Sequence, residues 1–313
     1  MGSTYQNKTF VGTLALILVT AAWGLSFTLI KDAVASLSPF TFVSVRFLMA
    51  SLILGLFLKI RPAGKLIATS RRELYAGAFL GLLLFLGYAF QTLGLQFTSA
   101  SNAGFITGMC VVFVPIFTLY MKSAKVKWNA WTGVALSVLG LSLLSFSSGQ
   151  GINKGDILIL FCSIAFALHI IFVGKYAETF DPFRLTWIQI TICGGLSLIA
   201  AILLEQNALA TLPITLLIPK VIVALSFCAL FATAAAYFIQ NAFQRYSTPV
   251  KTALIFTCEP VFSALFAYIL GGETLQPQQI AGCLFLFCGM IVAEVGNAAL
   301  LYLRFKIGLK PSA

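Results

Sequence analysis

Charged residues are scarce in this sequence of 313 residues: Asp, Glu, Lys and Arg make up 9% of it, whereas a typical soluble domain carries roughly 25%. Hydrophobic residues make up 60%, and the mean hydropathy is +0.99. A chain with so little charge cannot cover a surface that faces water, which excludes a soluble globular protein. Its high hydrophobicity excludes a disordered one. The composition therefore predicts a polytopic membrane protein.

The sequence also lacks the patterns that hold cofactors. It has no Walker loop or glycine-rich phosphate cradle, which argues against ATP-driven activity. Its seven cysteines all lie in apolar runs without Cys-x-x-Cys spacing, and a single histidine cannot form a metal site alone. We therefore expect no cofactor, no metal and no enzyme activity. The net charge of +11 does not indicate nucleic acid, because basic residues in membrane proteins mostly lie on cytoplasmic loops.

Ten apolar runs are long enough to form membrane-spanning helices, which need about 20 residues each. Breaker pairs such as Ser38-Pro39 and Asp181-Pro182 separate them, and they lack the alternation of barrel strands. The expected spans cover residues 10–31, 40–60, 74–96, 99–121, 129–147, 155–175, 184–204, 219–243, 248–270 and 277–301. The sequence thus predicts an all-α membrane protein with ten transmembrane helices and no separate soluble domain.

The distribution of basic residues predicts the orientation of these helices. If the N-terminus is cytoplasmic, the inside segments hold sixteen Lys and Arg residues and the outside loops hold three. Basic residues favour the cytoplasmic side. We therefore expect both termini in the cytoplasm of a multi-pass protein of the plasma (inner) membrane.

The two halves of the chain resemble each other. Tyr88 and Gln91 correspond to Tyr237 and Gln240 at an offset of 149 residues, and the segment 38–40 corresponds to 181–183 at an offset of 143. Each half carries five spans, an odd number, so the second half must enter the membrane inverted relative to the first. Inverted repeats that pack around a midplane site are typical of secondary transporters. We predict a first five-helix repeat over 1–149 and a second, with a short C-terminal tail, over 150–313.

The chain resembles the drug/metabolite transporter superfamily, in its ten-helix form with two EamA domains. The resemblance covers about residues 10–300 and rests on motifs in both halves: Ala22-Trp23-Gly24-Leu25-Ser26-Phe27, Pro39-Phe40 with Arg46-Phe47, Phe97-Thr98-Ser99-Ala100-Ser101-Asn102-Ala103, Tyr246-Ser247-Thr248-Pro249, Glu259-Pro260-Val261-Phe262 and Gly271-Gly272-Glu273. It implies a secondary transporter of small organic solutes, often amino acids or other metabolites and often outward. One proline departs from the repeat. The position matching Pro260 is Val111, and the chain has Pro115 one turn later, which predicts kinks at different depths in spans four and nine.

Glu259 and Arg46 are charged residues that lie well inside predicted spans, where charge is costly. Glu259 lies near the midplane, directly before Pro260, and either couples transport to protons or binds a cationic group, or else holds the kink through a bond to a neighbouring helix. Arg46 either clamps a carboxylate or phosphate, since its guanidinium binds bidentately, or reaches outward toward solvent or Asp32.

Aromatic, amide and imidazole groups inside the spans are the remaining candidates. A cavity with aromatic walls and a few amides suits an amino acid, and it suits equally a cation held by cation–π contact. The alternative for each is ordinary packing with interhelical hydrogen bonds, or, for His169, a bond to a backbone carbonyl. With Arg46, the predicted substrate-binding residues are Trp23, Tyr88, Gln91, Asn102, His169, Trp187, Tyr237, Gln240 and Asn241. Gly77 and Gly81 are expected to let two helices approach closely.

The residues thus predict a secondary transporter of small organic metabolites, amino acids or related solutes foremost, that works by alternating access of its two halves. Proton coupling through Glu259 and export are part of this hypothesis. A carrier of quaternary amines or cationic drugs is the alternative substrate class, and a non-transporting membrane receptor or scaffold is the alternative from another class. The expected partners are a small-molecule substrate and the lipid bilayer, without nucleic acid, and the protein is expected to be a monomer or homodimer.

Overall fold

The computed structural model describes residues 2–33, 36–60, 70–98, 100–122, 126–145, 153–271 and 276–306. Within these ranges the chain is helical and contains no strand. The helices are α1 (Gly2–Ala33), α2 (Pro39–Ile60), α3 (Arg71–Gly94), α4 (Ala100–Gly108), α5 (Cys110–Tyr120), α6 (Trp128–Ser145), α7 (Lys154–Ala177), α8 (Pro182–Leu204), α9 (Gln206–Thr215), α10 (Pro219–Ala229), the π-helix η2 (Leu230–Ala235), α11 (Ala236–Phe243), the 3₁₀ turn η3 (Gln244–Tyr246), α12 (Pro249–Phe256), α13 (Cys258–Gly271) and α14 (Pro277–Lys306).

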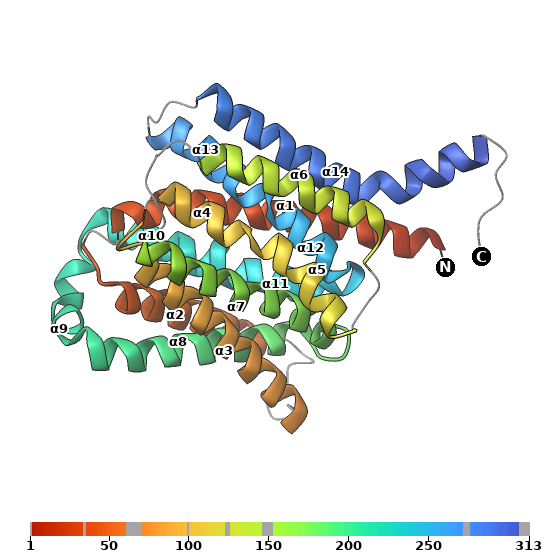
Figure 1. Ribbon diagram of the computed structural model, residues 1–313. Helices are drawn as coiled ribbons and strands as arrows, with labels where there is room; N and C mark the ends of the chain where they lie inside the picture. Colours follow the sequence, from red (N-terminus) through yellow and green to blue (C-terminus); the bar gives the residue numbers. More distant parts are fainter. Residues whose placement is uncertain are drawn as a thin grey trace.

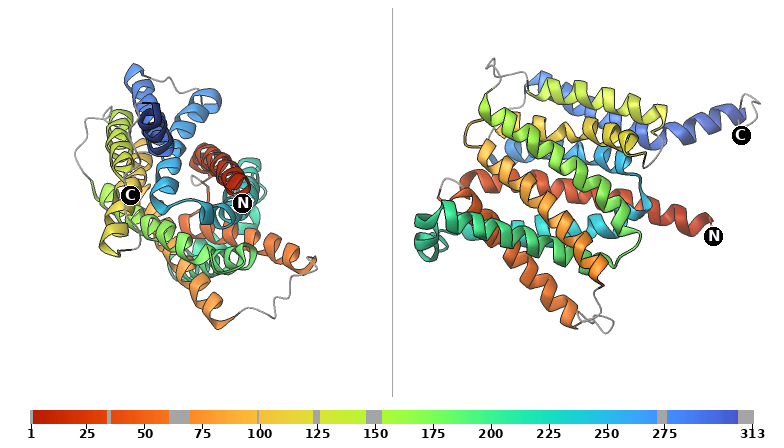
Figure 2. Two further views of the ribbon diagram at one scale, coloured as in Figure 1. Left: turned by 90° about the vertical axis from the view of Figure 1, so that its right-hand side faces the viewer. Right: turned by 60° about the horizontal axis from the view of Figure 1, so that its bottom comes forward.

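All ten expected spans coincide with helices or consecutive helical pieces. Seven helical segments of the described chain are long and apolar enough to cross a membrane, and the two apolar stretches Ile106–Tyr120 and Pro277–Val292 are shorter. Helix α6, of 18 residues, occupies the fifth span. The start of α1 and the end of α14 lie at the same end of the bundle (Figures 1 and 2), as an even number of spans requires.

Two helices begin at an Xaa-Pro pair whose first side chain caps the helix. The Asp181 carboxylate caps α8 by accepting from the backbone N–H groups of Phe183 and Arg184, with Pro182 at the first helical position. Thr248 caps α12 in the same way, ahead of Pro249. These caps satisfy backbone donors that the first turn of a helix leaves free, which is why Asp-Pro and Thr-Pro end one span and begin the next.

Helix α9 was not expected from the sequence. It follows α8 at the left-hand end of the bundle in Figure 1, and most of its residues are exposed. Between the two helices, the Glu205 carboxylate accepts from the backbone N–H groups of Phe40 and Thr41 at 3.0 and 2.8 Å. A carboxylate at this place complements the positive end of α2. Glu205 therefore ties the end of α8 to the start of α2.

The kinks of spans four and nine lie at matching depths, so the expectation drawn from the displaced Pro115 is wrong. Span four breaks at Met109, between α4 and α5, and span nine breaks at Thr257, between α12 and α13. Pro115 lies inside α5, six residues beyond the break. At both breaks a backbone N–H bonds to the carbonyl three residues earlier, the tighter 3₁₀ pattern. The repeat thus keeps the depth of the break although one proline has moved.

The two halves interdigitate instead of forming separate lobes. Helix α1 packs against α10, α11 and α13 of the second half, while α7 packs against α3, α4 and α5 of the first. Across the repeat, α2 pairs with α8 and α6 with α14, the pair that runs along the top of Figure 1. Each of these contacts has its counterpart under exchange of the halves, as expected for two copies of one fold related by a pseudo-two-fold axis.

Glycines allow the closest of these contacts, as expected at Gly77 and Gly81. A Cβ atom on Gly81 would lie 2.7 Å from the backbone oxygen of Gln189, and one on Gly77 would lie 2.6 Å from the side chain of Ile188. Near the start of both helices, Arg184 Nε donates to both oxygens of Glu73 at 3.1 Å. Helices α3 and α8 are therefore held together by close backbone packing and by an ion pair.

Candidate functional site

Arg46 lies on α2 in the interior of the bundle, with 2% of its surface exposed. Its Nε donates to the Thr233 hydroxyl at 2.6 Å, and its Nη2 donates to the Ala232 carbonyl at 3.0 Å. A longer bond of 3.5 Å runs from Nη2 to the Tyr88 hydroxyl. Arg46 thus does not reach outward to solvent, and that expectation is wrong. The side chain of Asp32, the other expected partner, lies outside the described residues.

Tyr88 on α3 and Tyr237 on α11 meet at the centre of the molecule. Their hydroxyls form a hydrogen bond of 2.9 Å, and the two residues are 149 positions apart, the offset that relates the two halves. Both side chains are at least nine-tenths buried. Two equivalent residues of a repeat touch only where its symmetry axis passes between them. The pseudo-two-fold axis therefore runs between these tyrosines.

Aromatic rings surround the tyrosine pair. The Trp23 ring lies 5.8 Å from Tyr237 and 5.0 Å from Phe256, measured between centroids, and its Nε1 donates to the Ala232 carbonyl at 2.9 Å. Phe47 packs edge-on against Tyr88 at 5.0 Å. The Arg46 guanidinium lies 5.1 Å from the centroid of the Tyr88 ring, within cation–π range. The centre is thus an aromatic cluster with one guanidinium.

His169 on α7 joins this cluster on the side of Tyr237, at 5.8 Å between ring centroids. Its Nε2 shares a hydrogen bond of 2.9 Å with Oε1 of Gln189 on α8, so the partner is a side chain and not the backbone carbonyl considered above. His169 is 2% exposed and Gln189 is fully buried. Gln189 Nε2 has no hydrogen-bond partner in the described part of the chain.

The 143-residue offset relates the two sides of this centre. It places Gln189 in the position of Arg46 and Phe166 in the position of Trp23. Phe166 packs against Tyr88 at 5.4 Å, much as Trp23 packs against Tyr237. The tyrosines are kept in both halves while the charged residue is present in only one. The centre is therefore symmetric in shape and asymmetric in charge.

Glu259 lies at the start of α13, two residues beyond the break at Thr257, and is only partly buried. Its charge interacts with that of Arg46. Within the described ranges, no hydrogen bond or ion pair joins its carboxylate to another residue. The expected bond that would hold the kink is thus not found there. Glu259 and Arg46 thus carry opposite charges without forming a direct ion pair.

The other predicted site residues that the structure describes form no hydrogen bond with the tyrosine hydroxyls, although Asn241 Nδ2 donates to the Tyr237 backbone carbonyl at 2.8 Å. Trp187 sits in the seam between α2 and α8, where its Nε1 donates to the Ser51 carbonyl. Gln91 makes a long bond of 3.5 Å to Thr107. Gln240 and Asn241 are buried in a polar network that bonds Gln240 to Gln244 and Asn241 to Thr186. Each of these four side chains bonds to another protein group, and their role in substrate binding stays a prediction. The side chain of Asn102 lies outside the described residues.

Sequence reasoning missed three contributors to the centre: Phe47, Gln189 and Thr233. Gln189 could have been found, because applying the 143-residue offset to Arg46 leads directly to it. Phe47 was noted only as part of a family motif. Thr233 had no signal, because its role depends on the π-helix η2, which no pattern in the sequence predicted.

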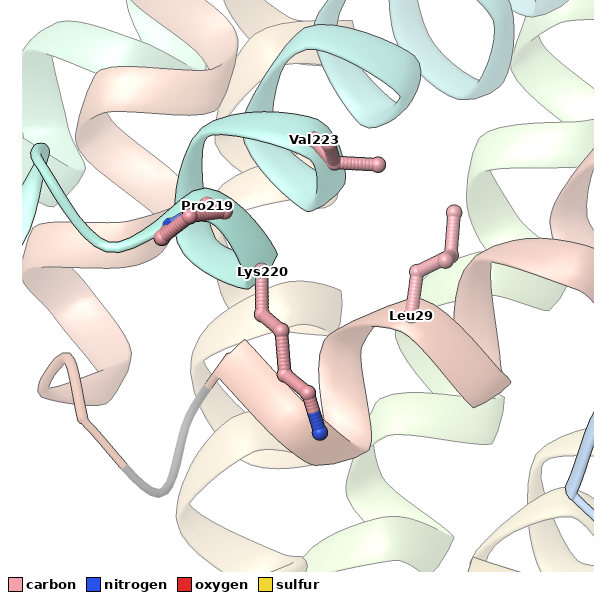
Figure 3. A pocket seen from close by; sticks show the side chains of 4 residues that line it. All are labelled: Leu29, Pro219, Lys220 and Val223. Atoms are coloured by element: carbon pink, nitrogen blue, oxygen red, sulfur yellow. The ribbon is translucent and has the colours of Figure 1, made fainter.

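A pocket of about 220 Å³ lies elsewhere, near the C-terminal end of α1 (Figure 3). Leu29 of α1 and Pro219, Lys220 and Val223 of α10 line it. It contains none of the predicted site residues. Among the residues that the structure describes, no group of three or more His, Cys, Asp and Glu side chains could hold a metal ion.

Comparison with known proteins identifies this architecture. The model of the EamA-like transporter family matches the chain twice, over residues 10–146 and 153–294. The chain belongs to the EamA-like transporter family. An uncharacterized transporter of Archaeoglobus fulgidus is 34% identical over 294 residues, which cover 94% of this chain and 89% of that protein. The uncharacterized inner membrane transporter YedA of Escherichia coli K12 is 29% identical over 271 residues, 84% of this chain and 83% of that protein.

A solved crystal structure shows the same fold. It superimposes with a TM-score of 0.77 at 14% sequence identity and covers 91% of this chain and 98% of that chain. This EamA protein is thus a multi-pass membrane transporter with ten helices in two inverted repeats, which confirms the predicted family and fold class. Its relatives are named as transporters, in agreement with the expectation that it is not an enzyme.

Proposed function

We propose that this EamA protein is a secondary carrier of small zwitterionic metabolites, with amino acids as the foremost class. The observation that carries the proposal is the pair of opposite charges at the centre. Arg46 lies buried beside the Tyr88 ring, and Glu259 carries the opposite charge two residues beyond the break at Thr257; no ion pair joins the two side chains. Charges inside a bilayer are costly unless they face a partner or a pathway. A substrate with a carboxylate and an ammonium group would complement both.

In the proposed site, Arg46 binds the carboxylate of the substrate. Its Nε and Nη2 are engaged by Thr233 and Ala232, and no described residue accepts a hydrogen bond from Nη1. Charge-assisted hydrogen bonds from guanidinium to carboxylate are stronger than neutral ones. Glu259 binds the ammonium group of the substrate, and the rings of Trp23 and Phe47 provide apolar surface for its side chain.

The aromatic rings alone would also suit a quaternary amine. Trp23, Tyr88 and Tyr237 resemble the walls of a cage for an organic cation. A buried guanidinium beside those rings opposes such a ligand, because like charges repel most strongly where water is excluded. The cationic class therefore remains the second candidate.

The remaining features of the proposal follow from the sequence and the family. Transport proceeds by alternating access of the inverted repeats, export is the direction, and Glu259 couples transport to protons. The protein resides in the inner membrane with both termini in the cytoplasm, as a monomer or homodimer. The name of the Escherichia coli relative supports the membrane assigned here.

Counterflow in proteoliposomes tests the substrate class. The panel contains aromatic and aliphatic amino acids, their decarboxylated amines, their deaminated acids and choline, at two pH values. We expect saturable, transient accumulation of labelled amino acid against unlabelled amino acid inside, and a loss of at least tenfold in affinity when either charged group is removed. If choline and the amines show counterflow and the amino acids do not, the substrate class is organic cations and the proposed zwitterionic class is wrong.

A further inference from the structure

The π-helix η2 interrupts the eighth span at its centre. It covers Leu230–Ala235, and the N–H of Ala236 donates to the carbonyl of Phe231, five residues earlier. Such bulges displace carbonyls from the regular α-helical ladder and allow them to accept bonds from side chains. Helix α3, the counterpart of this span in the first half, runs without interruption over its 24 residues. The π-helix therefore belongs to one side of the centre only.

Two helices of the first half donate to this bulge. The Ala232 carbonyl accepts from Trp23 Nε1 of α1 at 2.9 Å and from Arg46 Nη2 of α2 at 3.0 Å. A carbonyl oxygen has two lone pairs, so these donors use its full capacity. The neighbouring Thr233 hydroxyl accepts from Arg46 Nε at 2.6 Å. Ala232 and Thr233 are both fully buried, so water does not compete for these bonds.

These two acceptors, which are closer than the Tyr88 hydroxyl at 3.5 Å from Nη2, determine how the guanidinium is oriented. Because the group is planar, fixing Nε and Nη2 also fixes the direction of Nη1. Thr233 is the only one of the two acceptors that a substitution can remove, since the other is backbone. Without its hydroxyl, Arg46 would lose the bond at Nε and could rotate about its side chain while still buried.

We propose that Thr233 is the positioning residue for Arg46, and that its hydroxyl holds the guanidinium with Nη1 directed to the substrate carboxylate. This inference rests on the proposed function. Thr233 would contribute to binding without touching the substrate. The π-helix would have the role of presenting a hydroxyl and a carbonyl side by side to one guanidinium. The specificity for a carboxylate then depends on η2 as well as on Arg46.

The test compares Thr233→Val, Thr233→Ser and the control Thr118→Val in counterflow. Valine keeps the shape and removes the acceptor, while serine keeps the acceptor. Thr118 on α5 is also fully buried, but its hydroxyl has no hydrogen-bond partner in the described ranges. We expect Thr233→Val to raise the KM for amino acids about tenfold or more, with a maximal rate within about threefold of wild type. Thr233→Ser and Thr118→Val should keep the wild-type KM.

Three results would overturn the proposal: an unchanged KM in Thr233→Val, an equal rise in Thr118→Val, or an equal rise for the decarboxylated amine. If the wild-type protein shows no amino acid counterflow, the proposed function fails and a different measurement decides the role of Thr233. Arg46 is then modified with phenylglyoxal and quantified by peptide mass spectrometry. Faster modification in Thr233→Val than in Thr118→Val supports positioning, and equal rates refute it.

Discussion

At the scale of single residues, Arg46 and Glu259 differ in how their charges are compensated by hydrogen bonds. Arg46 exchanges its water for a hydroxyl and a carbonyl of the π-helix, which makes its burial tolerable. Glu259 has no such bonds with the described residues and is only partly buried. A carboxylate in that setting is free to exchange a proton or to bind a cationic group. The two residues are thus suited to different tasks.

The first prediction at this scale concerns Glu259. If this carboxylate couples transport to protons, Glu259→Gln removes the group that exchanges the proton and keeps the shape of the side chain. We expect its amino acid counterflow to become independent of pH between the two values of the panel, while a pH gradient no longer drives net transport. Flux under both conditions is measured in proteoliposomes.

Glu205→Gln is the matched control for this measurement. Glu205 is a carboxylate at the end of α8. It caps α2 by accepting hydrogen bonds from two backbone N–H groups. It should keep the wild-type pH profile. Should Glu259→Gln transport normally with an unchanged pH profile, the coupling role assigned to Glu259 is wrong.

At the scale of elements, helix contacts are set by small residues and by breaks. Gly81 brings α3 within van der Waals distance of the α8 backbone, next to Gln189, the partner of His169. The breaks at Met109 and Thr257 and the π-helix η2 interrupt regular hydrogen bonding at the level of the centre. Interrupted helices inside a membrane occur where protein or a cavity satisfies the backbone.

The prediction at this scale is that Gly81→Ala destabilises the bundle. The added Cβ would meet the Gln189 carbonyl oxygen at 2.7 Å, and because that atom is backbone, α3 and α8 must separate. Overpacking of this kind typically costs about 1–3 kcal/mol. We expect a lower thermal unfolding temperature in detergent, measured by the fluorescence of a thiol-reactive dye on the buried cysteines.

Gly195→Ala on α8 provides the comparison for this measurement. No atom lies within 4 Å of a Cβ built on Gly195, and alanine favours a helix over glycine. It should leave the unfolding temperature unchanged or raise it. Equal unfolding temperatures for the two variants would show that the α3–α8 seam tolerates separation.

At the scale of the whole molecule, the interdigitated halves constrain the transport motion. Because α1 packs on helices of the second half and α7 on helices of the first, neither five-helix repeat can move as a separate lobe. If transport proceeds by the proposed alternating access, the groups that move would therefore combine helices of both halves, with α1 and α7 exchanged. The start of α1 and the end of α14 lie at the same end of the bundle (Figure 2).

The prediction at this scale is the orientation in the membrane. A green fluorescent protein fused after residue 313 should fluoresce, and alkaline phosphatase at the same place should be inactive, because both termini are expected in the cytoplasm. A truncation after residue 150 retains five spans and should give an active phosphatase. The opposite pattern in both fusions would reverse the orientation derived from the sixteen and three basic residues.

Much of the site could be predicted in kind but not in arrangement. Tyr88 and Tyr237 stood out because they recur at a fixed offset, and they meet at the axis of the repeat. Gln91 and Gln240 recur at the same offset, yet they lie in separate networks. Recurrence shows that two positions are equivalent, and only distance from the axis decides whether they touch.

The membrane class, the ten spans, the inverted repeat and the family could all be predicted from the order of the residues. These follow from local sums of hydropathy and from the position of breakers, because a lipid-embedded chain must satisfy its backbone within each helix. Which polar groups meet, by contrast, depends on how the helices pack in three dimensions. Arg46 bonds to residues 186 and 187 positions away, on a π-helix whose bulge turns Ala232 and Thr233 toward it. The rotation and crossing of helices set such pairs, and no periodicity along the chain encodes them.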